Sequence, residues 1–328
     1  MSSEFLPTGP LPVTFSSMND QKKVVALGGG HGLYTSLKAL KLLTEDLTAL
    51  VTVADDGGSS GRIRQQLPHM LPPGDLRMAL SALCDDTSWG KTWREVMQYR
   101  FTTNGDLNGH SVGNMLLVAL WDLTGDQVES LETAAKLLEA KGTVLPMSLE
   151  PLDIEGDLLL DGEVVTISGQ HNLAKAKGKI LDVRLSPPEA KIPHKAEDAL
   201  MNADYIVVGP GSLYTSILPH FLLENLRTVL GKTDAKLCFA LNINLSDDET
   251  DGMKAVDHLK VLENFAHGIK FDYIIVNSES LDDKSAFERQ AQKMGAEVIS
   301  EKLAHSHHPE VHDPLRLATV YNEIFNKD

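Results

Sequence analysis

Two glycine-rich turns constrain the fold of this chain more than any other feature. Each lies between an apolar run and a polar or helical segment. Residues 24–27 are β-branched or aliphatic and stop at the glycine turn of residues 28–32, and residues 36–43 then have helical spacing. A second apolar run, residues 47–54, ends in the Asp-Asp-Gly-Gly-Ser-Ser-Gly stretch of residues 55–61. Successive strand, turn and helix units predict parallel strands joined by right-handed crossovers. We therefore expect an α/β fold, a parallel sheet with helices on both faces.

The middle of the chain changes character twice. Four segments have helical patterns, at residues 78–84, 93–101, 112–123 and 131–139. Residues 144–185 then alternate in short apolar segments around an Asp-Gly turn at residues 161–162, which predicts a small antiparallel β subdomain inserted into the α/β core.

Strands followed by polar or glycine turns return in the last third of the chain. They are predicted at residues 205–208, 236–241 and 273–276. Because parallel strands end at the same edge of a sheet, the turns predict one site along that edge. The sequence thus divides into a disordered arm (1–20), a nucleotide-binding part (21–140), the inserted β subdomain (141–190) and the second part of the α/β core (191–328).

Composition excludes some functions. A net charge of −16 argues against sequence-independent binding of nucleic acid, which depends on Lys and Arg. Apolar runs such as residues 115–121 are too short to cross a membrane, so no membrane association is expected. The two cysteines, Cys84 and Cys238, are far apart and lack metal-ligand spacing, which fits a reducing compartment and predicts a cytoplasmic location. Backbone N–H groups still allow an acidic chain to bind a small anion.

The first turn provides four candidate ligand residues: Gly29, Gly30, His31 and Gly32. Glycines between a strand and a helix let the backbone approach an anion, and the helix N-terminus adds partial positive charge. A phosphate or pyrophosphate is the expected guest. The turn departs from the G-x-G-x-x-G pattern because Leu33 stands at the last position, and a tight turn without a ligand remains the alternative.

The second turn begins with two acids, Asp55 and Asp56, where a dinucleotide-binding fold places a ribose-binding carboxylate. Either acid suits ligand hydroxyls or Mg²⁺ held against phosphate oxygens, and no other cofactor is indicated. The alternative is a solvated Asp-Gly turn. The other candidates in this turn are Gly57, Gly58, Ser59, Ser60 and Arg62.

Further candidates lie at later turns. Asp75 is placed equally well to contact a ligand or to cap a helix. In the segment that contains His110 and Asn114, helix capping by Ser111 is as good an explanation as ligand binding. The glycine turn at residues 209–212 enters another helix and could hold a second phosphate or another part of the ligand. A purely structural turn is the alternative. The remaining candidate ligand residues are Asp75, Arg77, His110, Asn114, Gly211, Ser212, Tyr214 and Asn242.

The histidines near the C-terminus do not have the spacing of a metal site on a predicted helix. They are His305, His307, His308 and His312, and the following Asp313-Pro314 pair predicts the start of a helix. Ser59, Ser60 and Cys84 lack a nearby arrangement of His and acid that would identify a nucleophile, so the sequence does not support a hydrolase triad. No catalytic residue is assigned.

Five segments together resemble the family that joins the gluconeogenesis factors (YvcK) to the 2-phospho-L-lactate transferases (CofD): residues 28–33, 54–64, 72–77, 109–114 and 209–219. The resemblance is strong over residues 24–219 and looser through residues 249–252 to 312–313. The Ala-Asp-Asp-Gly-Gly-Ser-Ser-Gly-Arg block is similar to the gluconeogenesis-factor branch. The transferases typically have Asn-Thr-Gly-Asp-Asp at that strand end.

The resemblance implies a Rossmann-like protein that binds UDP-sugars such as UDP-N-acetylglucosamine and supports cell shape and wall synthesis on gluconeogenic carbon sources, without established turnover. Many relatives have Thr where this chain has His31, and Arg where it has Val311. The alternative is a transferase that passes a phospholactyl-type group from a guanosine diphosphate carrier to a deazaflavin alcohol, with Asp55 or Asp56 holding Mg²⁺. A third hypothesis, an NAD-linked oxidoreductase, depends on the glycine turn alone. The sequence does not decide whether the chain forms a homo-oligomer or which downstream protein it binds.

Overall fold

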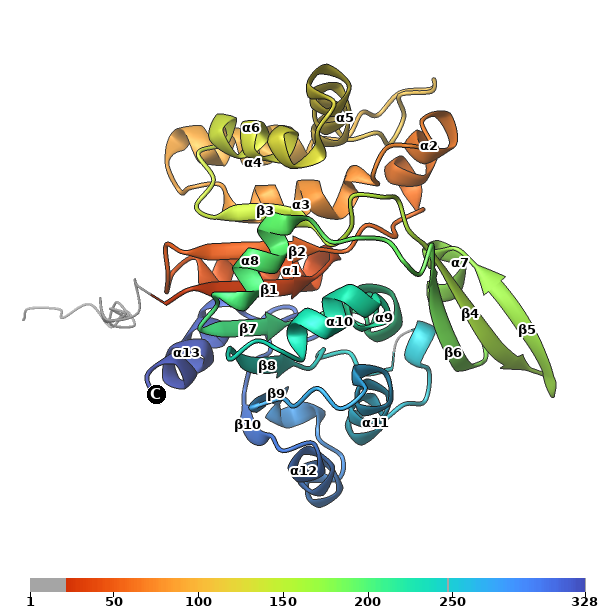
Figure 1. The fold of residues 1–328 in the computed structure, drawn as a ribbon, viewed down its shortest axis with the longest axis vertical. Helices are drawn as coiled ribbons and strands as arrows, with labels where there is room; N and C mark the ends of the chain where they lie inside the picture. The colour runs from red at the N-terminus through yellow and green to blue at the C-terminus, as the bar shows by residue number, and fades with distance from the viewer. Residues whose placement is uncertain (1–21, 247, 328) are drawn as a thin grey trace, which may run out of the picture.

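A seven-stranded parallel sheet forms the centre of the molecule (Figure 1). The computed structural model describes residues 22–246 and 248–327, so the arm expected over residues 1–20 lies outside the described residues. In spatial order the strands are β10 (Glu297–Glu301), β9 (Tyr273–Asn277), β8 (Lys236–Ala240), β7 (Tyr205–Val208), β1 (Val24–Gly28), β2 (Leu47–Val51) and β3 (Thr143–Pro146). Every pairing between them is parallel, which confirms the predicted α/β fold.

The strand order reverses direction between β1 and β7. Val24 of β1 lies opposite Leu47 of β2 on one side and opposite Tyr205 of β7 on the other. From β1 the chain builds outward to β2 and β3, returns to β7, and builds outward again to β10. In open α/β sheets, ligands bind at the carboxyl ends of the strands where the order reverses.

Helices cover both faces of this sheet. Figure 1 shows α8 and α10 in front of the sheet and α1 and α3 behind it. The helices are α1 (Gly30–Leu40), α2 (Gly58–Gln66), α3 (Pro73–Leu83), α4 (Ser88–Gln98), α5 (Val112–Thr124), α6 (Gln127–Leu137), α8 (His194–Met201), α9 (Pro219–Leu222), α10 (Glu224–Leu230), α11 (Ala255–Ala266), α12 (Lys284–Lys293) and α13 (Pro314–Phe325). No helix in residues 22–246 and 248–327 is both long and apolar enough to cross a membrane.

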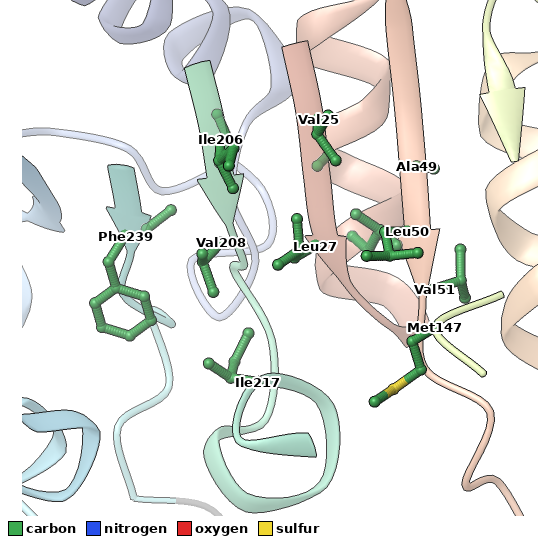
Figure 2. Packing of buried hydrophobic residues seen from close by; sticks show 14 of the residues in the cluster. Val25, Leu27, Ala49, Leu50, Val51, Met147, Ile206, Val208, Ile217 and Phe239 are labelled. Carbon is green, nitrogen blue, oxygen red and sulfur yellow. The ribbon is translucent and has the colours of Figure 1, made fainter. Parts of the chain in front are cut away.

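The central strands are apolar along their whole length because helices bury both of their faces. Every residue of β1, β2 and β7 is buried. Figure 2 shows Leu27 of β1 between Leu50 of β2 and Val208 of β7, with Ile217 and Met147 beyond the ends of the strands. The core therefore continues up to the loops at the carboxyl edge and supports them.

A second, three-stranded antiparallel sheet projects beside the carboxyl edge of the main sheet (Figure 1). Its order is β5 (Glu163–Ser168), β4 (Asp153–Leu160) and β6 (Lys179–Ser186), and the short helix α7 (Gln170–Ala174) connects β5 to β6. The sheet thus covers residues 153–186. Residues 143–146, which the sequence groups with the insertion, form β3 and pair with β2.

Candidate functional site

The turns after β1 and β7 pack directly against each other. A side chain on Gly32 would overlap the carbonyl of Pro210 and the backbone of Gly211. Backbone atoms cannot yield as the end of a flexible side chain can, so this contact requires glycine at position 32. The predicted turns at residues 28–32 and 209–212 therefore meet at the reversal of strand order, and Ser212 lies half-buried beside them.

The first turn presents open backbone to solvent. Gly30 has φ +58° with no atom within 4 Å of where a side chain would begin, so the space beside it is vacant. Gly29 caps α1 without a side-chain hydrogen bond, and the first turn of α1 contains no acid. His31 is exposed in that turn. These features are those of an anion-binding helix N-terminus.

The second turn begins a similar helix. Gly57 caps α2 without a side-chain hydrogen bond and α2 has no acid in its first turn, while Gly58 has φ +47° and open space beside it. The Gly57 N–H donates to Asp55 Oδ1 at 2.9 Å. Ser60 Oγ accepts the Gly74 N–H at 3.1 Å and so joins this turn to the start of α3.

Asp55 and Asp75 bring two carboxyl groups together beneath the Gly30 turn. A side chain on Gly74 would begin 2.6 Å from Asp55 Oδ2, so glycine there makes room for that carboxyl. Burial raises the pKa of Asp55 above its usual range. Burial and the charge of Asp55 raise the pKa of Asp75 to about 7, although the Gly30 N–H acts in the opposite direction. The N-cap of α3 is Pro72, so Asp75 is not the cap that its sequence position allowed.

Asp56 points away from this pair. Its Oδ1 accepts the His171 N–H at 2.7 Å, and a side chain on Gly169 would overlap its Oδ2. The two adjacent acids therefore diverge, one toward α3 and the other toward the inserted sheet. In residues 22–246 and 248–327, no group of three or more His, Cys, Asp or Glu side chains gathers as metal ligands.

Four of the candidate residues form a buried hydrogen-bond network that joins α2, α3 and α5. Asn114 Nδ2 donates to Ser59 Oγ at 3.0 Å, and Ser59 Oγ lies 3.0 Å from His110 Nδ1. Arg77 Nε donates to Asn114 Oδ1 at 2.9 Å, and the guanidinium also donates to Gln98. Burial lowers the pKa of Arg77 to about 10, and burial with the nearby arginines lowers the pKa of His110.

Arg62 supports the segment that carries His110. Its guanidinium donates to the carbonyls of Asp106 and Asn108 at 3.2 and 2.7 Å. Ser111 caps α5 by accepting the Asn114 N–H, as its position predicts. The network and Arg62 therefore fix α2, and with it the second turn, against the helices around it.

On the β7 side, Tyr214 is buried and reaches a residue that the sequence analysis missed. Its N–H donates to Glu249 Oε1 at 3.0 Å, and burial with the charge of Glu249 raises the pKa of its phenol to about 12. Glu249 lies in η3 (Asp248–Thr250), inside the residues 249–252 that the family resemblance covers loosely, but it was not among the candidate site residues. Asn242 is half-buried beyond β8, where its Oδ1 accepts the N–H of Ile243 at 3.1 Å.

The C-terminal histidines separate into two environments. His312 is buried, and burial lowers its pKa to about 4. His305, His307 and His308 lie in the preceding loop, where the rings of His305 and His308 stack 5.6 Å apart. Asp313 caps α13 by accepting the N–H groups of Leu315 and Arg316, which bears out the helix start predicted there.

Comparison with known proteins agrees with these observations. The family model described as 2-phospho-L-lactate transferase CofD matches residues 24–312, which include both turns, the inserted sheet and all seven strands of the main sheet. The chain belongs to this family. Within the family, its similar relatives include proteins named gluconeogenesis factor, the branch that residues 54–62 resemble.

The similarity to relatives in this family extends over most of each chain. A Mycobacterium tuberculosis protein is 41% identical over 312 residues, which cover 93% of this chain and 91% of that protein. The gluconeogenesis factor of Bacillus subtilis is 34% identical over 324 residues, 94% of this chain and 100% of its own. A crystal structure from Bacillus halodurans superposes with a TM-score of 0.81 at 34% identity, covering 91% of this chain and 98% of that one.

Proposed function

We propose that this chain is a nucleotide-sugar-binding regulatory protein of the gluconeogenesis factor type. Its ligand is a UDP-sugar such as UDP-N-acetylglucosamine. The protein acts in the cytoplasm, where it supports cell shape and wall synthesis during growth on gluconeogenic carbon sources. The observation that carries the proposal is the contact between the two glycine turns where the strand order reverses. A pyrophosphate there meets the N-terminus of α1.

The first test is thermal unfolding with UDP-N-acetylglucosamine, GDP, a deazaflavin or NAD added. A ligand at a hundred times its dissociation constant stabilises the folded state by about 2.7 kcal/mol. We expect the largest shift with UDP-N-acetylglucosamine. A shift of the unfolding temperature with NAD alone would indicate a dinucleotide-binding protein. No shift with any of the four compounds would contradict the proposed nucleotide site.

Gly30→Ala tests where the phosphates bind. Its methyl group would enter the vacant space beside the turn, so we expect at least about a tenfold loss of affinity for UDP-N-acetylglucosamine in calorimetry. The positive φ also costs about 1 kcal/mol of folding stability. Gly125→Ala is the matched control because Gly125 has φ +71° and open space beside it at the end of α5. Both variants should lose similar stability, and equal affinities for the ligand would place the phosphates elsewhere.

The second candidate is the transferase that passes a phospholactyl-type group from a guanosine diphosphate carrier to a deazaflavin. The Asp55 and Asp75 pair favours it, because Mg²⁺ is often held by one or two carboxylates together with substrate phosphates. The ion would supply charge neutralisation on the diphosphate. Mass spectrometry of a reaction containing both substrates, with Mg²⁺ or with a chelator, tests this activity. Product that forms with Mg²⁺ and disappears in Asp55→Asn would support the enzyme.

A further inference from the structure

A cavity of about 560 Å³ opens between the β7 turn, the inserted sheet and α11. Its size is within the range of small-molecule sites, which is about 300–1,000 Å³. It is formed by η2 (Leu213–Ile217), η3, the start of α11 and the first residues of β6. The lining residues that matter below are Ile180, Tyr214, Glu249, Asp251, Met253 and Val261.

This cavity lies next to the glycine turn that follows β7. Tyr214, which lines it, follows Gly211 by three residues. A side chain on Gly211 would begin 3.9 Å from the carbonyl of Gly29, so the two turns are adjacent at that point. The cavity therefore begins three residues beyond a glycine turn that is itself adjacent to Gly29.

Three acids and two lysines, Lys179 and Lys260, line the cavity, so its net charge does not favour a second phosphate. Glu249 is 5% exposed and Asp251 stands at the exposed rim. Asp257 also lines the cavity, but Lys260 Nζ donates to its Oδ1 at 2.9 Å and the N–H of Lys254 donates to its Oδ2 at 3.2 Å. The carboxylates that face the cavity favour hydroxyl or N–H donors, while Ile180, Met253 and Val261 provide apolar surface.

The Tyr214 side chain is 5% exposed and has a hydroxyl group at this cavity. Among the residues that the structure describes, this hydroxyl has no hydrogen-bond partner. A polar ligand group in the cavity would supply one.

We propose that this cavity holds the sugar ring of the nucleotide-sugar, with Tyr214 and Glu249 contacting its hydroxyl groups. The proposal rests on the proposed function and adds the place of the sugar. A hexose offers several hydroxyl donors to the acidic rim and a C–H face to Met253 and Val261. Uracil would instead turn two carbonyl acceptors toward carboxylates, with a single N–H donor to compensate.

Tyr214→Phe tests the proposal because it removes only the hydroxyl. Calorimetry with UDP-N-acetylglucosamine and with UDP measures how much the sugar adds to affinity. We expect the variant to lose about 2- to 10-fold in affinity for UDP-N-acetylglucosamine, the effect of one hydrogen bond, and to bind UDP as the wild type does. Tyr99→Phe, at an exposed tyrosine, is the matched control and should change neither affinity.

Val261→Phe is a second variant that fills the cavity. It should abolish the preference for UDP-N-acetylglucosamine over UDP and leave UDP binding intact. Met201→Phe is its control, because Met201 is partly exposed and lines a separate groove between α8 and α10. Equal losses of affinity for both ligands would place the uridine in the cavity. An unchanged preference for UDP-N-acetylglucosamine in both variants would show that the sugar does not bind in the cavity. Either result overturns the proposal while the proposed function stands. A wild type that binds neither ligand overturns both.

Discussion

Asp75 carries a carboxyl group that is only partly charged at neutral pH. Its pKa is about 7 against an ordinary value of 3.8, because burial and the charge of Asp55 both oppose its ionisation. The folded state therefore holds a proton that the unfolded state releases between about pH 4 and 7. Over that range the contribution of Asp75 to stability falls as pH rises, and above it the contribution stays constant at its lowest value.

Asp75→Asn should remove this pH dependence. The difference between the free energies of unfolding, variant minus wild type, should increase as pH rises from about 5 to 7. The change is at most about 1.4 kcal/mol per pH unit. Urea denaturation across this range measures it. Asp161→Asn, at the exposed turn between β4 and β5, removes a surface charge and is the control. Parallel stability curves for Asp75→Asn and the wild type would contradict the assignment.

At the scale of elements, the Asn114 side chain connects three helices. Asn114→Ala breaks its hydrogen bonds to Ser59 and Arg77 and leaves both buried groups with fewer partners. Such losses cost about 1–3 kcal/mol each, so we expect the variant to lose about 2–6 kcal/mol of folding stability in urea denaturation. Asn202→Ala removes an exposed hydrogen bond at the end of α8 and should cost far less. Similar losses in both would mean that the network adds little.

The sequence predicted the central strands well because they are apolar runs buried on both faces. Residues 205–208 coincide with β7, and residues 24–27 form all but the last position of β1. The edge strands gave weaker signals. β3 contains four residues without alternation, and β10 begins and ends with an exposed glutamate, so periodicity could not place either in the main sheet.

Candidate turns could be located from sequence, but their partners could not. The adjacent acids Asp55 and Asp56 look like one unit, yet the folded chain pairs Asp55 with Asp75 and directs Asp56 to the backbone of α7. Glu249 follows its strand by several residues in a short helix. Contacts of this kind depend on how distant segments pack, which no local pattern encodes.

At the scale of the whole molecule, α7 attaches the inserted sheet to the turns of the main sheet. Asp56 accepts the His171 N–H, and Gln170 Nε2 donates to the carbonyl of Thr215 at 3.2 Å. Asp56→Ala should therefore accelerate amide hydrogen exchange in β4 to β6 more than in β1 and β2. Asp182→Ala, at an exposed position of β6, is the control. Unchanged exchange in the inserted sheet would show that Asp56 does not hold it.

The reversal of strand order places Val24 beside Tyr205, so the central seam of the sheet joins segments that are distant along the chain. The turn at Asp161 and Gly162, at the tip of the inserted sheet, lies between those segments in sequence. A chain cut there yields one fragment with β1 to β3 and another with β7 to β10, and each contributes one of the two glycine turns. A nucleotide that contacts both turns would then bind the two fragments together, which makes this fold a natural starting point for a split reporter of its own ligand.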